Sequence, residues 1–454
     1  MVAHVIGASM LVLAACGTRV EDQPVAAGPG STVTSIITSG AADPTGSGTI
    51  DSGDGQTGEA ATDGGEVGGG NEGVLEVGDD GGTGGGGAVP QGGPPIVIGS
   101  VQTKGGLVGD NGAGAVASLS AWAAAVNARG GINGRQVQLI TIDDGGDPGR
   151  HASAVRKLIQ EKHVVAFVGN YAPLTFSAGA PLIEEAGIPS IGGDSGEKGY
   201  FTSPNAFAFN GAAYPEGIAA GKWAPAALRD KTKLAVFYIA EIEFGARIAK
   251  HMADGWRAAG KEVVAYSSIS LGQPDYTAEI LQAQGGGAQV VAVYGDFSAC
   301  RRFWDAARRQ SYKPVWIGAS ACLDPSAIDA ADQTTNNFYV SMPLEPPSSD
   351  LPAVREMREA MARYAPNFPH PEANGVLMRG WDSGKLFERV IEVSGGKTDS
   401  KSLIDALHSM TNETIYGLSS PLDWPPGPHP ERTCGKMLKF NGDRYVTVTP
   451  EYVC

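Results

Sequence analysis

From residue 95 onward, short apolar runs alternate with helix-length segments, and this alternation constrains the fold more than any other feature. The apolar runs are continuous, which is typical of strands buried on both faces of a parallel sheet that helices cover. We expect strands at 96–101, 137–143, 164–169, 234–239, 262–269, 289–295 and 314–318, with shorter ones in GIPSIG and NAFAFN. The sequence therefore predicts an α/β fold.

This folded part, about 360 residues, exceeds one comfortable core, and its strand–helix units divide near Gly211 into two similar groups. We expect two doubly wound, Rossmann-like lobes joined by a hinge of several crossovers, with 95–211 and 345–418 in one lobe and 212–344 and 419–454 in the other. Ligands of such sheets bind beyond the carboxyl ends of the strands. A binding site is therefore expected in the cleft between the lobes.

The N-terminal part differs sharply in composition. Residues 17–94 hold 24 of the 65 glycines, no aromatic residue, and −11 of the net charge of −15. Such a segment cannot bury enough apolar area to offset its chain entropy, so we expect a disordered tether. The rest of the chain is only mildly acidic and has no basic cluster, which argues against a nucleic-acid partner.

Residues 1–16 form a short apolar run that ends in Leu13-Ala14-Ala15-Cys16. This run is too short to span a membrane and resembles a bacterial lipoprotein signal peptide, although no Lys or Arg precedes it. The alternative is an unprocessed N-terminus. We expect Cys16 to carry a lipid, and the protein to be extracytoplasmic and held at the cell membrane by that anchor alone.

Four cysteines remain after Cys16, and an even number in an exported chain suggests two disulfides. Three pairings are possible. Cys300 and Cys322 each follow an apolar strand, and Cys434 and Cys454 flank a predicted hairpin with an Asn-Gly turn, so we expect Cys300–Cys322 and Cys434–Cys454. No CxxC or CxxH spacing supports a zinc site, and we expect no metal.

Residues 128–169 closely resemble the first-lobe signature of the type I periplasmic-binding-protein family, in particular its branched-chain amino-acid (Leu/Ile/Val) branch. The matching features are Gly130-Gly131-Ile132-Asn133-Gly134, a strand, Asp143-Asp144, Asp147-Pro148, a helix, and a strand that ends in Gly169. The resemblance to this family covers nearly all of the chain from about Pro95 to Cys454. The resemblance implies a non-enzymatic, monomeric, lipid-anchored protein that captures a small amino acid, amide or carboxylate-like solute and delivers it to an ABC permease. The alternative is a surface receptor that signals ligand occupancy to a partner protein.

Members of this family bind their ligand with short loops that follow the strands. In the first lobe, the resemblance places ligand contacts at Tyr171, Thr175, Asp194 and Ser195, with Gln102 as a further candidate. The glycines before Asp194 are expected to let the backbone approach the ligand.

In the second lobe, the resemblance places contacts at Phe244, Phe297 and Ser320, and packing within the lobe is the alternative role of both phenylalanines. Ser320 stands where amino-acid binders carry the acid that pairs with the ligand's amine. Our hypothesis is that Asp194, Asp296 or Glu243 replaces this acid.

Residues 193–196 spell GDSG, as at the nucleophile of chymotrypsin-like proteases. Such an enzyme needs two β-barrels with a histidine and an aspartate upstream, and the pattern here is α/β. The α/β-hydrolase motif GxSxG is absent as well. Neither a P-loop nor a dinucleotide-binding glycine spacing is present, so we expect no cofactor. Ser195 is therefore interpreted as a hydrogen-bonding hydroxyl.

Overall fold

The computed structural model describes residues 75–76, 92–194, 196–209, 215–242, 245–323, 337–427, 432–441 and 444–454. All of them belong to one compact unit, 69–454. Cys16 and most of the expected tether lie outside the described residues.

The first sheet has the strand order β1-β3-β2-β4-β5-β6. Its strands are β1 (Leu75–Glu76), β2 (Ile96–Gln102), β3 (Val137–Asp143), β4 (Ala166–Val168), β5 (Ser190–Ile191) and β6 (Ala206–Phe207). All pairs are parallel except β1–β3. The chain winds outward in both directions from β2 and β4, so the topological switch point lies between these two strands.

The second sheet has the order β13-β12-β11-β10-β9-β7-β8. Its strands are β7 (Lys233–Ile239), β8 (Glu262–Ile269), β9 (Val290–Tyr294), β10 (Val315–Ala319), β11 (Phe338–Met342), β12 (Lys436–Phe440) and β13 (Tyr445–Thr447). Five strands are parallel, and the C-terminal hairpin β12–β13 adds to β11 antiparallel. The switch point here lies between β7 and β9.

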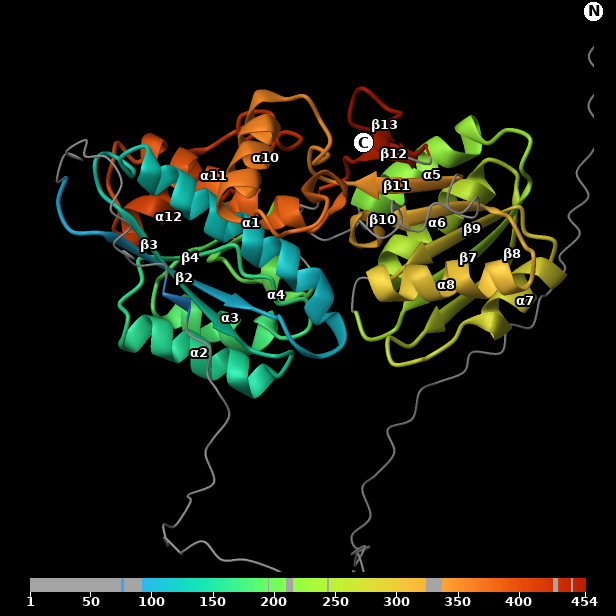
Figure 1. Cartoon of the computed structure of the whole chain (residues 1–454), viewed down its shortest axis with the longest axis horizontal. Helices are drawn as coiled ribbons and strands as arrows, with labels where there is room; N and C mark the ends of the chain where they lie inside the picture. Colours follow the sequence, from blue (N-terminus) through green and yellow to red (C-terminus); the bar gives the residue numbers. More distant parts are fainter. Residues whose placement is uncertain are drawn as a thin grey trace, which may run out of the picture. The chain divides into compact units, whose positions relative to one another are not determined.

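Helices cover both faces of each sheet (Figure 1). On the first sheet they are α1 (Gly109–Ala128), α2 (Pro148–Gln160), α3 (Phe176–Glu185), α4 (Gly199–Thr202), α10 (Pro352–Tyr364), α11 (Leu377–Val393) and α12 (Ser400–Ser409), and on the second α5 (Pro215–Ala227), α6 (Gly245–Ala258), α7 (Thr277–Gly285) and α8 (Phe297–Arg309). Short 3₁₀ turns lie at Gly106–Val108, Ser320–Cys322 and Pro371–Ala373. The two-lobe α/β architecture predicted from the sequence is confirmed.

Two glycines set the close crossing of α11 over α1. A Cβ atom at Gly380 would lie 2.0 Å from the carbonyl oxygen of Ala115, and one at Gly384 would lie 2.2 Å from the Trp122 ring. Any larger side chain would force the helices apart, so these positions fix where α11 presents its side chains.

Three further features bear on the sequence predictions. The structure contains the disulfides Cys300–Cys322 and Cys434–Cys454. Within 17–94, where no ordered element was expected, Leu75–Glu76 forms β1 on the edge of β3, since this short apolar stretch offers backbone groups that the free edge can pair with. Among the described residues, no helix is both long enough and apolar enough to cross a bilayer.

Candidate functional site

A cavity of about 620 Å³ lies where the carboxyl ends of strands from both sheets meet. Its lining comes from the segments that follow β2, β4 and β5 in the first sheet and β7, β9 and β10 in the second, together with the N-terminal turns of α5 and α11. The lining residues are Val108, Tyr171, Pro173, Asp194, Glu216, Ile242, Gly245, Ile248, Tyr294, Gly295, Asp296, Ala319, Ser320, Ala321, Val376 and Arg379. Both topological switch points thus open into one cavity.

On the first-sheet side, the cavity carries a buried ion pair. The guanidinium of Arg379, in the first turn of α11, lies 3.6 Å from Oδ1 of Asp194, and each side chain is only 9% exposed. The other oxygen of Asp194 accepts a hydrogen bond from the amide of Gly196 at 2.9 Å. Asp194 is therefore held between a cation and a backbone donor at the cavity wall.

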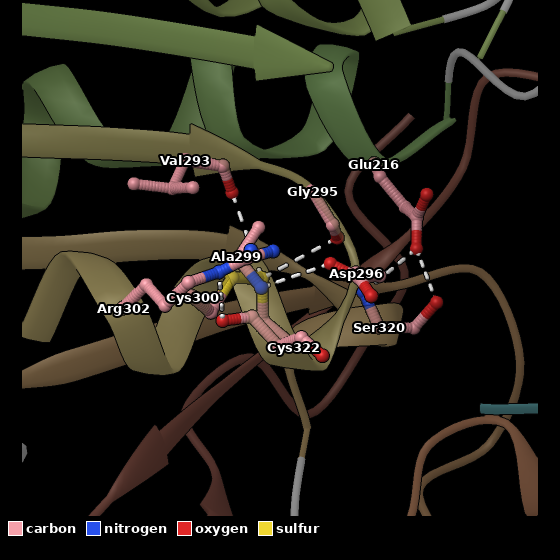
Figure 2. Close-up of a disulfide and its surroundings, with 10 residues drawn as sticks. Glu216, Val293, Gly295, Asp296, Ala299, Cys300, Arg302, Ser320 and Cys322 are labelled. Carbon is pink, nitrogen blue, oxygen red and sulfur yellow. Dashed lines mark hydrogen bonds between the residues drawn. A yellow bond between two sulfur atoms is a disulfide. The ribbon is translucent and has the colours of Figure 1, made fainter. Parts of the chain in front are cut away.

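On the second-sheet side, Glu216 in the first turn of α5 is almost fully buried. Its Oε1 accepts hydrogen bonds from the amide of Ser320 at 2.9 Å and from the Ser320 hydroxyl at 2.5 Å. Figure 2 shows the second oxygen of Glu216 pointing away from Ser320. An acid from α5 thus stands beside Ser320, where the resemblance expected an acid that the local sequence lacks.

Burial governs the charge state of the second-sheet carboxyls. It raises the pKa of Glu216, and the positive charge of Arg379 and the two Ser320 hydrogen bonds only partly oppose it. Burial also raises the pKa of Asp296, although Asp296 caps α8 by accepting a hydrogen bond from the amide of Ala299. Both groups therefore hold their protons more tightly than exposed carboxyls do.

The expected ligand contacts divide into three groups. Tyr171, Asp194 and Ser320 line the cavity, whereas Gln102, Thr175 and Phe297 are not among its lining residues. Ser195, Phe244 and the alternative acid Glu243 lie outside the described residues.

Gln102 and Thr175 make hydrogen bonds inside the first lobe instead. The side-chain amide of Gln102 donates to Ser100 Oγ and to the carbonyl of Gly169, both at 2.7 Å. The hydroxyl of Thr175 donates to Asp144 Oδ2 at 2.6 Å. These bonds hold together segments of the first lobe. They use the side-chain amide of Gln102 and the hydroxyl of Thr175, the donors that the resemblance assigns to a ligand.

Asp144 is the centre of that buried network. Its oxygens also accept hydrogen bonds from Thr103 Oγ1 and the amide of Gly146, both at 2.8 Å, and Oδ2 lies 2.8 Å from Nδ1 of the buried His151. Burial alone would raise the pKa of Asp144, but the hydrogen bonds from His151, Thr175 and Gly146 outweigh it and lower the pKa. The network ties the loops after β2 and β3 to the start of α3.

The glycines before Asp194 serve the fold. Gly192 and Gly193 have φ of +67° and +88°. A Cβ atom at Gly192 would lie 2.3 Å from Ser383 Oγ, and one at Gly193 would lie 2.4 Å from the carbonyl oxygen of Asn170. Their backbone therefore lies close to α11 and to the loop after β4, and neither glycine is among the residues that line the cavity.

A disulfide supports the second-sheet wall of the cavity. Cys300 in α8 and Cys322 in the 3₁₀ turn Ser320–Cys322 are joined directly beside Asp296 and Ser320 (Figure 2). The strands that precede the two cysteines, β9 and β10, are parallel neighbours, which is the arrangement that the predicted pairing needs. The covalent link limits how far the Asp296 and Ser320 segments can separate.

The donor set around the cavity does not suggest a metal. In the described part of the chain, no three side chains of the His, Cys, Asp and Glu type gather as metal ligands. The cavity instead combines an apolar wall with a few fixed polar groups, which is the usual composition of a small-molecule site.

Comparison with known proteins agrees with this geometry. A family model described as periplasmic binding protein matches residues 95–429. An amino acid binding protein of Pseudomonas aeruginosa is 26% identical over 174 residues, which is 37% of this chain and 44% of that protein. The Leu/Ile/Val-binding protein homolog 7 of Brucella abortus is 25% identical over 349 residues, 72% of this chain and 84% of that protein.

Solved structures share the fold. The fatty acid ABC transporter substrate-binding protein from Thermomonospora curvata superimposes with a TM-score of 0.67 at 18% identity, covering 79% of this chain and 92% of that one. A branched chain amino acid ABC transporter protein from Thermus thermophilus with bound valine also gives 0.67 at 18% identity, covering 79% and 96%. These relatives are binding proteins of transport systems rather than enzymes. The chain belongs to the periplasmic binding protein family and has its type I fold.

Proposed function

We propose that this protein captures a small solute in the cavity between its two lobes, outside the cytoplasm, and delivers it to an ABC permease. The observation that carries the proposal is the cavity itself. Both lobes contribute polar groups to it, with Asp194 and Arg379 from one lobe and Glu216 and Ser320 from the other. A solute that contacts both sets favours the closed arrangement of the lobes, which the permease would recognise.

The chemistry of the cavity supports a small amphipathic ligand. Apolar side chains such as Ile242, Ile248 and Val376 form much of its wall, and few polar groups are available to orient a ligand. The named relatives bind amino acids or a fatty acid, so amino acids, amides and small carboxylates are the first classes to test.

The N-terminal sequence supports the cellular setting of this role. A lipid on Cys16 and a glycine-rich tether would keep the binding lobes near a permease in the membrane while they act as a monomer. A glycine-rich tether that ends where β1 begins, about 58 residues from Gly17 to Val74, would have a typical end-to-end span of roughly 40 Å. Metabolic labelling of the full chain with a palmitate analogue tests this part, because Cys16→Ser should abolish the label.

Thermal-shift screening of the full chain tests the binding role. The expected result is a concentration-dependent rise in Tm with at least one small solute, because a ligand that binds only the folded state stabilises it by mass action. A panel of amino acids, amino-acid amides, small carboxylates and amines covers the chemistry of the cavity. If no member of the panel raised the Tm at millimolar concentration, a role in solute capture would be contradicted.

A further inference from the structure

The cavity lining holds more acidic than basic groups. Asp194, Glu216 and Asp296 are three carboxyls, and Arg379 is the one Lys or Arg among the described lining residues. Arg379 is already paired with Asp194. The charge of Arg379 also acts on Glu216, but neither Glu216 nor Asp296 forms an ion pair with a described residue of the lining.

One oxygen of Glu216 accepts no hydrogen bond from the described residues. Ser320 fills Oε1 with two hydrogen bonds, and no described residue donates to Oε2. Tyr294, at the end of β9, also lines the cavity, and its buried hydroxyl has no hydrogen-bond partner in the described part of the chain. An unpartnered buried hydroxyl is costly, and a ligand N–H group in the cavity could donate to the phenol oxygen of Tyr294 and to Oε2 of Glu216.

The first-lobe wall offers little to an anion. Pro173, in the loop after β4, has no N–H group, and it lines the cavity. The Thr175 hydroxyl donates to Asp144 instead of facing the cavity. A ligand carboxylate would therefore have to compete with Asp194 for Arg379, in a site that already contains three carboxyls.

We infer that the solute bound here is recognised through a positively charged nitrogen group that pairs with Glu216, and that it needs no carboxylate. This inference rests on the proposed function and narrows its ligand class. An ammonium group would supply N–H donors to Glu216 Oε2 and the Tyr294 hydroxyl, and its charge would offset the excess of acid. The apolar wall would cover the rest of the molecule, and the Tyr171 and Tyr294 rings suit a cation better than an anion.

Matched sets of probes distinguish recognition of a ligand's amine from recognition of its carboxylate. Each set keeps one apolar body and contains an amino acid, its carboxamide and its desamino acid, such as leucine, leucinamide and 4-methylpentanoate, or phenylalanine, phenylalaninamide and 3-phenylpropanoate. Calorimetric titration of the full chain gives Kd for each probe. We expect the carboxamide, which is cationic, to bind at least about tenfold more tightly than the amino acid, and the desamino acid not to bind.

The outcomes distinguish this inference from the proposed function. If the amino acid or the desamino acid bound most tightly within a set, the inference would be wrong while solute capture remained supported. Equal binding of the amino acid and the carboxamide would also contradict it, because the extra carboxylate should be repelled. If no probe of any set bound, both the inference and the proposed function would fail.

Discussion

Replacing Glu216 with glutamine is expected to weaken binding of the tightest carboxyl-free amine among the probes by about 10- to 100-fold. A charge-assisted hydrogen bond contributes about 1.5–3 kcal/mol, and glutamine keeps the size and the bonds to Ser320 while removing the charge. The measurement is Kd by titration calorimetry. Glu262→Gln is the matched control, because Glu262 is exposed at the start of β8 and lies outside the cavity lining.

The pH dependence of binding gives the same prediction a second readout. Since burial raises the pKa of Glu216, this carboxyl keeps its proton to higher pH than an exposed glutamate does, and a cationic ligand pairs with its ionised form. Binding should therefore tighten as pH rises and should release protons. The other ionisable groups that face Glu216 are Arg379, Asp194, Asp296 and Tyr294. Glu216→Gln should flatten the pH profile.

Two results would contradict this role of Glu216. An unchanged Kd for the amine in Glu216→Gln would show that the carboxyl does not contact the ligand. Binding that tightens as pH falls would indicate proton uptake, which is the signature of an anionic ligand. A shift in the Tm of the empty variant alone would not account for either readout, because both are measured on folded protein.

Replacing Asp144 with alanine is expected to lower the free energy of unfolding by about 3 kcal/mol or more. Thr103, Thr175, Gly146 and His151 would all lose a buried partner, and each unsatisfied buried group costs about 1–3 kcal/mol. Urea denaturation at neutral pH measures the loss. The control is Asp405→Ala, in an exposed ion pair with Lys401, which should change stability by less than about 1 kcal/mol.

The sign of the pH effect follows from the lowered pKa of Asp144. Its ionised form contributes stability above the unfolded-state pKa, about 3.9, and that contribution is lost as pH falls through the lower folded-state pKa. The stability difference between wild type and Asp144→Ala should therefore be constant near neutral pH and shrink in strong acid. A loss no larger than that of Asp405→Ala would show that the network does not hold the first-lobe loops together.

Most of the fold was predictable because it depends on local patterns. Continuous apolar runs marked the parallel strands, and β3 and β8 have the predicted bounds. Asp147 caps α2 and Pro148 begins it, as the Asp-Pro sequence indicated. The strand β11 was not predicted, because its five residues include a polar Ser341 and its place in the sheet depends on pairing with β10 and β12.

The site was less predictable from the sequence, because its main charged residues lie on helices that are far apart in the chain. Glu216 and Arg379 are 163 positions apart in the sequence, and only the tertiary fold brings them to the same cavity as Ser320. One local signal was available, because Glu216 is a lone charge among small or apolar neighbours at the start of a largely buried helix, and Arg379 lies in the first turn of another such helix. Conversely, the resemblance assigns the Thr175 hydroxyl to a ligand. Its hydrogen bond to Asp144 could not be foreseen, because Asp144 lies in another loop.

Titration of a cavity-filling variant tests solute capture most directly. Ala319 lines the cavity at the end of β10, and a tryptophan there would occupy the ligand's space. Calorimetry with the tightest-binding probe should give one site per chain in the wild type and no detectable binding in Ala319→Trp, with circular dichroism confirming that the variant is folded. Undiminished binding by the folded Ala319→Trp protein would place the solute elsewhere and contradict capture between the lobes.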